Sequence, residues 1–172
     1  METHGGNGLI FSHCYAHLDT GIVFEKDPTK AAILGKQRPT WAVYEADCIG
    51  ALASGVGNHL PINFLDLDPY GDPWPVLDAF FEGRRNLSPI LAIVVNDGLR
   101  QKVKMGGAWN AGSLSEVVSE FGNDLYPIYL EVCQELMIKK AVKAGYHLDR
   151  FGGYYCGHLK QMTHYYALLQ KN

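Results

Sequence analysis

Apolar and polar positions alternate along the chain in blocks that predict strands followed by helices. Short apolar runs rich in branched and aromatic residues predict strands, and apolar residues spaced three or four apart predict helices. The first four expected strands each precede a helix or helical turn, whereas the last two are expected to be joined by a tight turn. The expected strands are residues 21–25, 41–47, 61–68, 89–97, 146–158 and 162–170.

Helix boundaries are marked by capping residues. Asp27 and Pro28 suit the start of a helix, and Gly35 suits its end. Three more helices are expected on the same grounds, over residues 48–55, 72–83 and 126–144. The segment that follows residues 89–97 is expected to be a basic loop.

Alternation of strands with helices predicts an α/β, Rossmann-like fold: a mostly parallel sheet with helices on both faces, closed by a C-terminal antiparallel hairpin. The continuous apolar run of 89–97 predicts a strand covered on both faces. A chain of 172 residues fits one domain with a substantial core, so residues 1–172 are expected to form a single domain.

Acids and amides stand where the expected strands end. In parallel sheets, ligands bind at the carboxyl ends of the strands, so these side chains are candidate site residues. The alternative is that each acid caps the helix that follows it. The residues concerned are Glu25, Asp47, Asp66, Asp68, Asn96 and Asp97.

Composition restricts the classes of partner. A net charge of −3 gives no general attraction for nucleic acid, so such binding needs a local basic patch. Arg100, Lys102 and Lys104 follow the strand 89–97 and are candidate phosphate contacts, a solvated loop being the alternative. No apolar run is long enough to span a bilayer, and no signal peptide begins the chain.

The four cysteines form no C-x-x-C motif, which indicates reduced thiols and a cytoplasmic protein. His13 and His17 are four residues apart, but no third ligand stands at a motif distance. No metal site is therefore expected.

Two stretches carry a resemblance to a known family. "ETHGGNG" at residues 2–8 and "LDLDPYG" at 65–71, with acids at the strand ends between them, are similar to class I S-adenosylmethionine-dependent methyltransferases over essentially the whole chain. The resemblance implies S-adenosylmethionine as cofactor. The residues that it assigns to cofactor binding are Glu2, Gly6 and Gly8 at the methionine end, Glu25 at the ribose hydroxyls, Asp47 at the adenine amine and Cys48 (or Ile49) against the adenine ring.

The sequence Asp68-Pro69-Tyr70 resembles the motif of methyltransferases that act on nitrogen, and with Gly71 it is closest to the tRNA N2-guanine methyltransferases. The resemblance implies that Asp68 and the carbonyl of Pro69 accept the N–H groups of the target amine. It also implies that Tyr70 stacks on the target ring. Asp66 shares a strand face with Asp68 and is expected to support the substrate.

The function implied is N-methylation of an exocyclic nucleobase amine in nucleic acid, with RNA favoured over DNA because Gly71 follows Tyr70. One alternative is methylation of a protein amide or a small molecule. Another is a degenerate, non-catalytic binding module. The family's first strand should precede Glu2, so it is expected to be missing or truncated. Because no separate recognition domain is expected, rim loops, a homo-oligomer or a partner subunit would supply specificity.

Overall fold

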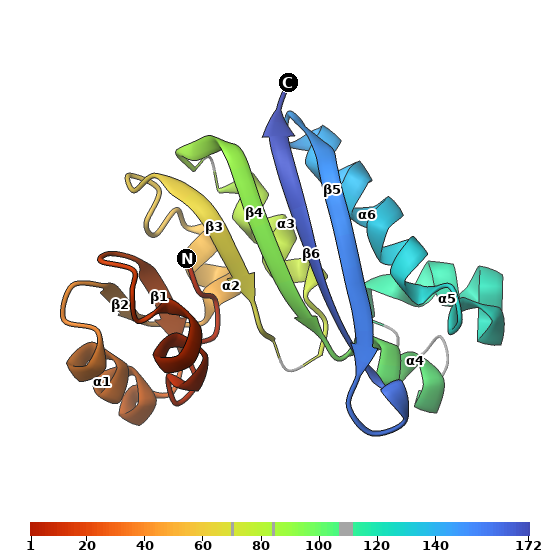
Figure 1. Cartoon of the computed structure of the whole chain (residues 1–172), viewed down its shortest axis with the longest axis horizontal. Helices are drawn as coiled ribbons and strands as arrows, with labels where there is room; N and C mark the ends of the chain where they lie inside the picture. The colour runs from red at the N-terminus through yellow and green to blue at the C-terminus, as the bar shows by residue number, and fades with distance from the viewer. Residues whose placement is uncertain (70, 84, 107–111) are drawn as a thin grey trace.

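A row of strands organises the computed structural model, which describes residues 1–69, 71–83, 85–106 and 112–172 (Figure 1). The carboxyl ends of the parallel strands meet at one edge of the sheet. The strands are β1 (Ile22–Glu25), β2 (Ala42–Glu45), β3 (Ile62–Leu67), β4 (Leu87–Asp97), β5 (Tyr146–Cys156) and β6 (Met162–Lys171).

Strand order differs from chain order. β1 pairs with β2 and β3 with β4 in parallel, whereas β4–β6 and β6–β5 are antiparallel. The start of the chain joins the two halves, because Glu2 forms parallel bridges to both Val23 and Asp66. The backbone N–H groups of Glu2 and Thr3 donate to the carbonyls of Ile22 and Asp66 at 2.8 and 3.0 Å. The place of the expected missing first strand is thus taken by residues 1–3.

The predicted helices begin and end close to the expected positions, but α1 is longer than expected, and α4 and α5 were not predicted. Asp27 caps α1 by accepting from the N–H groups of Thr29 and Lys30 at 2.9 and 3.1 Å. α1 continues past Gly35, where nothing crowds the helix, so the expected end there is wrong. The helical elements are η1 (Phe11–Tyr15), α1 (Pro28–Gln37), α2 (Cys48–Ala53), α3 (Trp74–Glu82), α4 (Leu99–Gly106), η3 (Gly112–Leu114), α5 (Ser115–Phe121), η4 (Gly122–Leu125), α6 (Tyr129–Lys143) and η5 (His158–Lys160).

The expected basic loop after β4 is wrong over residues 99–106, which form α4. Leu99 and Val103 are four residues apart and are both buried. Their spacing places them on one helix face, so packing against the core stabilises a segment that also carries Arg100, Lys102 and Lys104.

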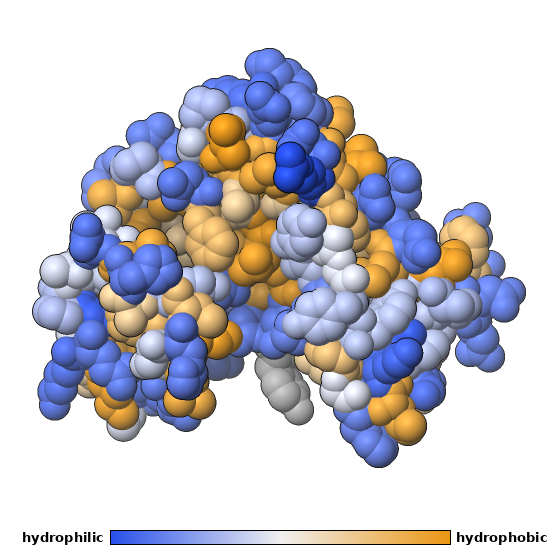
Figure 2. Space-filling model, viewed as in Figure 1, coloured by the Kyte–Doolittle hydropathy of each residue, from blue (hydrophilic) through white to orange (hydrophobic). Residues whose placement is uncertain are grey.

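Helices lie on both faces of the sheet, but they cover it unevenly. Leu91, Ile93 and Val95 of β4 are buried on the side of α3 and α6, whereas Ala92 and Val94 on the other side are only half-buried. The expectation that β4 is covered on both faces is therefore wrong. In Figure 1, α3 and α6 lie behind β4, β6 and β5, and no described helix lies in front of these three strands. Figure 2 shows apolar residues gathered on this open face.

Candidate functional site

A cleft of about 420 Å³ lies at the carboxyl ends of β1, β2 and β3. Its size falls within the range of small-molecule sites in proteins. We call it the strand-end cleft. It is lined by Thr3, His4, Gly6, Phe24, Glu25, Lys26, Ala46, Asp47, Cys48, Ile49, Asp68, Pro69, Asp72 and Val76.

Glu25 is held in this cleft by two backbone hydrogen bonds. One carboxylate oxygen accepts the N–H of Gly6 at 2.8 Å, and the other accepts the N–H of Asp27 at 2.9 Å. These bonds fix the plane of the carboxylate at the end of β1. Each oxygen has two lone pairs, so both keep the capacity to accept a further O–H donor such as a sugar hydroxyl.

The turn beside Glu25 contains three glycines, and each has different surroundings. Gly6 lines the cleft and has φ +53°, which favours glycine. Gly8 has φ +76° but lies against Gln37, outside the lining of the cleft. Gly5 packs most closely, since an added Cβ would lie 2.4 Å from Leu34 Cδ1. Sequence reasoning did not select Gly5, and only the contact with α1 shows its role.

The second strand end brings a carboxylate and an apolar side chain to the same cleft. Asp47 lines it and also accepts the N–H of Gly50 at 3.1 Å as the cap of α2. Cys48 is 4% exposed, and burial raises the pKa of its thiol to about 11, so the thiol is neutral. Ile49 is 40% exposed on the cleft and offers more free apolar surface to a flat ring than Cys48 does.

Glu2 lies outside the strand-end cleft. It is 2% exposed and pairs with the buried guanidinium of Arg38, which also lies 4.2 Å from the ring centroid of Phe11. Burial raises the pKa of Glu2, and the bond to Arg38 opposes that shift. Glu2 is thus bound to a buried partner, Arg38, and does not line the cleft. Its position does not support the expected contact with a cofactor.

His4, which the sequence did not mark as a site residue, also lines the cleft. Its two ring nitrogens lie 2.8 Å from Thr3 Oγ1 and 3.5 Å from Cys48 Sγ. Burial lowers the pKa of His4, so the ring is neutral near pH 7. It therefore adds a polar but uncharged group to this end of the cleft.

Asp68 stands where three hollows meet. It lines the strand-end cleft, a hollow of about 540 Å³ over the open face of the sheet, and a hollow of about 390 Å³ beside α4. We call the last two the sheet hollow and the α4 hollow. Asp68 Oδ1 accepts from Asn96 Nδ2 at 2.5 Å, and the carbonyl of Pro69 accepts the N–H of Gly71 at 2.8 Å. Tyr70 lies outside the described residues.

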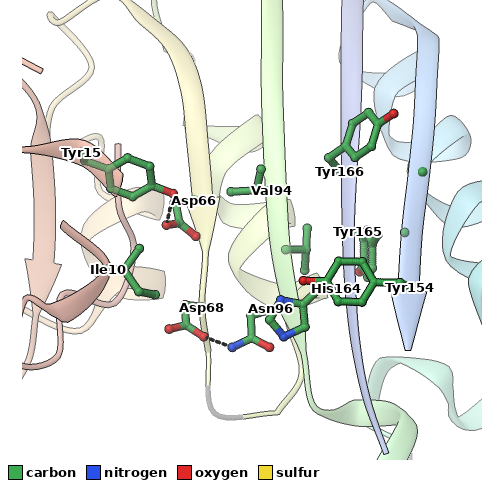
Figure 3. Close-up of a pocket in the computed structure, with 13 residues that line it drawn as sticks. Ile10, Tyr15, Asp66, Asp68, Val94, Asn96, Tyr154, His164, Tyr165 and Tyr166 are labelled. Atoms are coloured by element: carbon green, nitrogen blue, oxygen red, sulfur yellow. Dashed lines mark hydrogen bonds between the residues drawn. The ribbon is translucent and has the colours of Figure 1, made fainter. Parts of the chain in front are cut away.

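The sheet hollow lies between the N-terminal segment and the C-terminal hairpin (Figure 3). Ile10 and Tyr15 border it on one side, and Tyr154 and Tyr166 on the other. Asp66 lines it but is 5% exposed and accepts the hydroxyl of Tyr15 at 2.6 Å. Burial raises the pKa of Asp66. Asp66 therefore holds Tyr15 in place at the border of the sheet hollow, and Asp68 is the more accessible of the two acids.

The expected basic patch is smaller than the sequence suggested. Arg100 is 4% exposed, and its guanidinium donates to the carbonyls of Tyr126 and Lys160 while lying 3.8 Å from the ring centroid of Tyr155. This position leaves the guanidinium of Arg100 little free surface for the predicted phosphate contact. Lys102 lines the α4 hollow, and Lys104 is exposed.

Neither a metal-ion site nor a membrane-spanning helix is present among the described residues. No three His, Cys, Asp or Glu side chains in that part of the chain lie close enough together to hold a metal ion. Across the same residues, no helix has the length and apolar character needed to cross a membrane.

Comparisons with known proteins show the fold. No protein-family model and no curated protein matches the sequence. The structure of Trm1 from Pyrococcus horikoshii with S-adenosyl-L-methionine superposes with a TM-score of 0.69, at 14% identity, over 99% of this chain and 50% of that chain. The protein has the class I methyltransferase fold.

Further structures share this methyltransferase fold. TYW2 from M. jannaschii, in complex with AdoMet, gives a TM-score of 0.59 at 14% identity over 99% of this chain and 68% of that one. The N-methyltransferase NodS from Bradyrhizobium japonicum gives 0.60 at 8% identity over 99% and 84%. The present chain spans about half the length of the Trm1 chain. At these identities the fold is what is shared, and the roles of single residues depend on the geometry above.

Proposed function

We propose that the protein is an S-adenosylmethionine-dependent N-methyltransferase that acts on an exocyclic amine of a nucleobase. The observation that supports it is the position of Asp68, which lines the strand-end cleft and both neighbouring hollows. Methyl transfer requires the methyl donor and the acceptor nitrogen to lie next to each other. Asp68 lies between the cleft proposed for the donor and the hollows proposed for the acceptor.

The residues of the strand-end cleft fit the proposed cofactor. Glu25 offers two fixed acceptors for the ribose hydroxyls, and Asp47 offers an acceptor for the adenine amine. Ile49 presents apolar surface to the adenine ring, and Gly6 presents backbone at the methionine end. S-adenosylmethionine supplies a methyl group bonded to a positively charged sulfur.

Asp68 and Pro69 are proposed to prepare the amine. The lone pair of such an amine is spread into its ring, which makes the nitrogen a poor nucleophile. Asn96 occupies one oxygen of Asp68, which leaves the other to accept an N–H of the amine. The carbonyl of Pro69 has a second lone pair beyond its bond to Gly71 and is proposed to accept the other N–H. Holding the nitrogen in line with the methyl group then lowers the barrier by orientation.

Nucleic acid, and RNA before DNA, is the proposed substrate class. Lys102 lines the α4 hollow next to Asp68, and Lys104 is exposed two residues further along α4; both are proposed to contact phosphate. Neighbours in fold include Trm1, TYW2 and a protein described as a putative RNA methyltransferase from Pyrococcus horikoshii. A base that is unpaired or flipped out of a helix would reach the site at the lowest cost.

The proposal also includes the cellular compartment and the partners of the chain. The four cysteines are free thiols, which suits the cytoplasm. The chain is proposed to act as one domain, with a second copy or a partner subunit adding specificity, because few basic side chains border the site.

Methylation of a small molecule is the second candidate. The sheet hollow is large enough for one, and the fold neighbours include NodS and a plantazolicin methyltransferase. Salt dependence separates the two candidates, because phosphate contacts make nucleic-acid binding fall steeply as salt rises. A substrate affinity that does not change between 50 and 200 mM salt would favour the small molecule.

Calorimetric titration with S-adenosylmethionine tests the cofactor site. Glu25→Ala should weaken binding at least about tenfold, because it removes two hydrogen bonds to a charged group. Glu45→Ala is the matched control, since Glu45 ends the neighbouring strand in register with Glu25 and does not line the cleft. No binding by the wild-type protein at millimolar cofactor would reject the enzyme and favour a binding module.

Transfer of a labelled methyl group to bulk tRNA, DNA and protein tests the chemistry. Asp68→Ala should lower methyl transfer by roughly 100-fold or more, the scale for losing one contact made in the transition state. Its affinity for the cofactor should stay within about twofold of wild type. Asp124→Ala, an exposed acid on η4, is the control. Full activity of Asp68→Ala would contradict the proposed role.

A further inference from the structure

Four side chains form a continuous row across the open face of the sheet, and its first member is Asp68. Asn96 on β4 donates to Asp68, His164 on β6 is directly opposite Asn96, and Tyr154 on β5 is directly opposite His164. Neighbouring strands lie about 4.8 Å apart, so the backbones of Asp68 and His164 are roughly 10 Å from each other. Figure 3 shows the row along the lower edge of the sheet hollow.

The far end of the row is an aromatic pair that is ordered and still accessible. The rings of Tyr154 and His164 are stacked, with centroids 5.4 Å apart and planes at 22°. Tyr154 is nevertheless 62% exposed, and Tyr166 on the same wall of the hollow is 48% exposed. A ring that is already fixed by a neighbour loses little conformational entropy when a third ring stacks on it.

The charges of the hollow restrict what can lie on this pair. Asp66 and Asp68 line it, whereas no lysine or arginine is among the described residues of its lining. Anionic groups are therefore disfavoured, and a flat, uncharged group that carries N–H donors is favoured. The side-chain oxygen of Asn96, in the middle of the row, is buried and has no hydrogen-bond partner among the described residues.

We propose that Tyr154, supported by His164, is a stacking platform that binds the ring bearing the target amine. The ring would lie over Asn96 with its amine at Asp68 and would stack at its other end on Tyr154. This inference rests on the proposed function and adds substrate-binding residues from the C-terminal hairpin, far in sequence from the Asp68-Pro69 motif. The occupant is a neutral, planar, N–H-bearing heterocycle such as a nucleobase.

Quenching of 2-aminopurine riboside fluorescence tests the platform. This probe bears an exocyclic amine on a purine and loses fluorescence when it stacks. In the presence of S-adenosylhomocysteine, which carries no methyl group to transfer, the wild-type protein should quench it saturably. Tyr154→Ala should weaken the affinity about 5- to 150-fold, because stacking is worth roughly 1–3 kcal/mol per base and each 1.4 kcal/mol is tenfold.

Two further variants make the test specific. Tyr154→Phe keeps the ring and should keep the affinity within about threefold. His147→Ala changes an exposed residue at the other end of the same strand and should have no effect. Equal loss in Tyr154→Ala and Tyr154→Phe, an unchanged Tyr154→Ala, or no quenching by the wild-type protein would each overturn the platform.

Cofactor affinity, measured on the same samples, separates this inference from the proposed function. A Tyr154→Ala protein that binds S-adenosylmethionine like wild type but has lost the probe supports the platform. If the wild-type protein binds the cofactor and transfers methyl groups while Tyr154→Ala does so with an unchanged KM, the platform fails and the proposed function stands. If the wild-type protein does not bind the cofactor, the proposed function fails by itself.

Discussion

A buried acid at the end of β4 should make the stability of the fold depend on pH. Asp97 is fully buried; it accepts the N–H of Leu99 at 2.7 Å and the hydroxyls of Tyr129 and Tyr165 at 3.1 and 3.3 Å. Burial raises the pKa of Asp97 from 3.8 to about 7, although these three bonds oppose the shift. The thiol of Cys133, 3.9 Å away, adds no charge to the site, because burial raises its pKa as well.

The sign of the effect follows from the proton count. Between pH 4 and pH 7 the folded protein holds a proton on Asp97 that the unfolded chain has released, so stability falls as pH rises through this window. A pKa difference of this size is worth about 4 kcal/mol in total, at roughly 1.36 kcal/mol per pKa unit. Integration between pH 5 and pH 8 gives a loss of about 3 kcal/mol.

Asp97→Asn isolates this contribution, because asparagine has nearly the same shape and does not ionise. Urea unfolding followed by tryptophan fluorescence at pH 5 and pH 8 gives the two free energies for each protein. The free energy of unfolding of the variant relative to wild type should rise by about 3 kcal/mol from pH 5 to pH 8. Glu2 and Asp66 also have raised pKa values, but both proteins share them, so they cancel in the difference. Parallel pH profiles for the two proteins would refute the reasoning.

Two other substitutions test the structure near the site. Glu2→Gln should destabilise the fold by about 3–5 kcal/mol in urea unfolding, because it leaves the buried charge of Arg38 without its partner. Cofactor affinity measured on the folded fraction should be unchanged. A loss of that affinity without a loss of stability would show that Glu2 contacts the cofactor. Asn96→Ala should lower kcat at least about tenfold at constant cofactor affinity, because Asp68 loses the hydrogen bond that orients it; an unchanged kcat would show that Asp68 needs no such support.

The order of strands and helices could be read from the sequence because it depends on local pattern. Apolar runs predicted each strand, and the cap formed by Asp27 predicted the start of α1. The sequence also indicated which acids stand at strand ends, and parallel pairing brings the ends of such strands to one edge. For this reason Glu25, Asp47 and Asp68 could be selected together, and they line one cleft.

Only the tertiary structure decided which of these residues are accessible. Glu2 and Arg100 have the residue types expected of ligand contacts, yet each is buried against a partner distant in sequence, Arg38 in one case and the carbonyls of Tyr126 and Lys160 in the other. Spacing along the chain cannot reveal such partners, because they meet only when separate elements pack.

The open face of the sheet has the same origin. The sequence determined that 89–97 is an apolar strand, but whether its second face meets a helix or a hollow depends on where η1 and α1 lie. The row from Asp68 to Tyr154 exists because β6 pairs with β4 in one register, which places His164 opposite Asn96. A shift of one residue would turn His164 to the other face, so strand pairing, and not local sequence, assembles this side of the site.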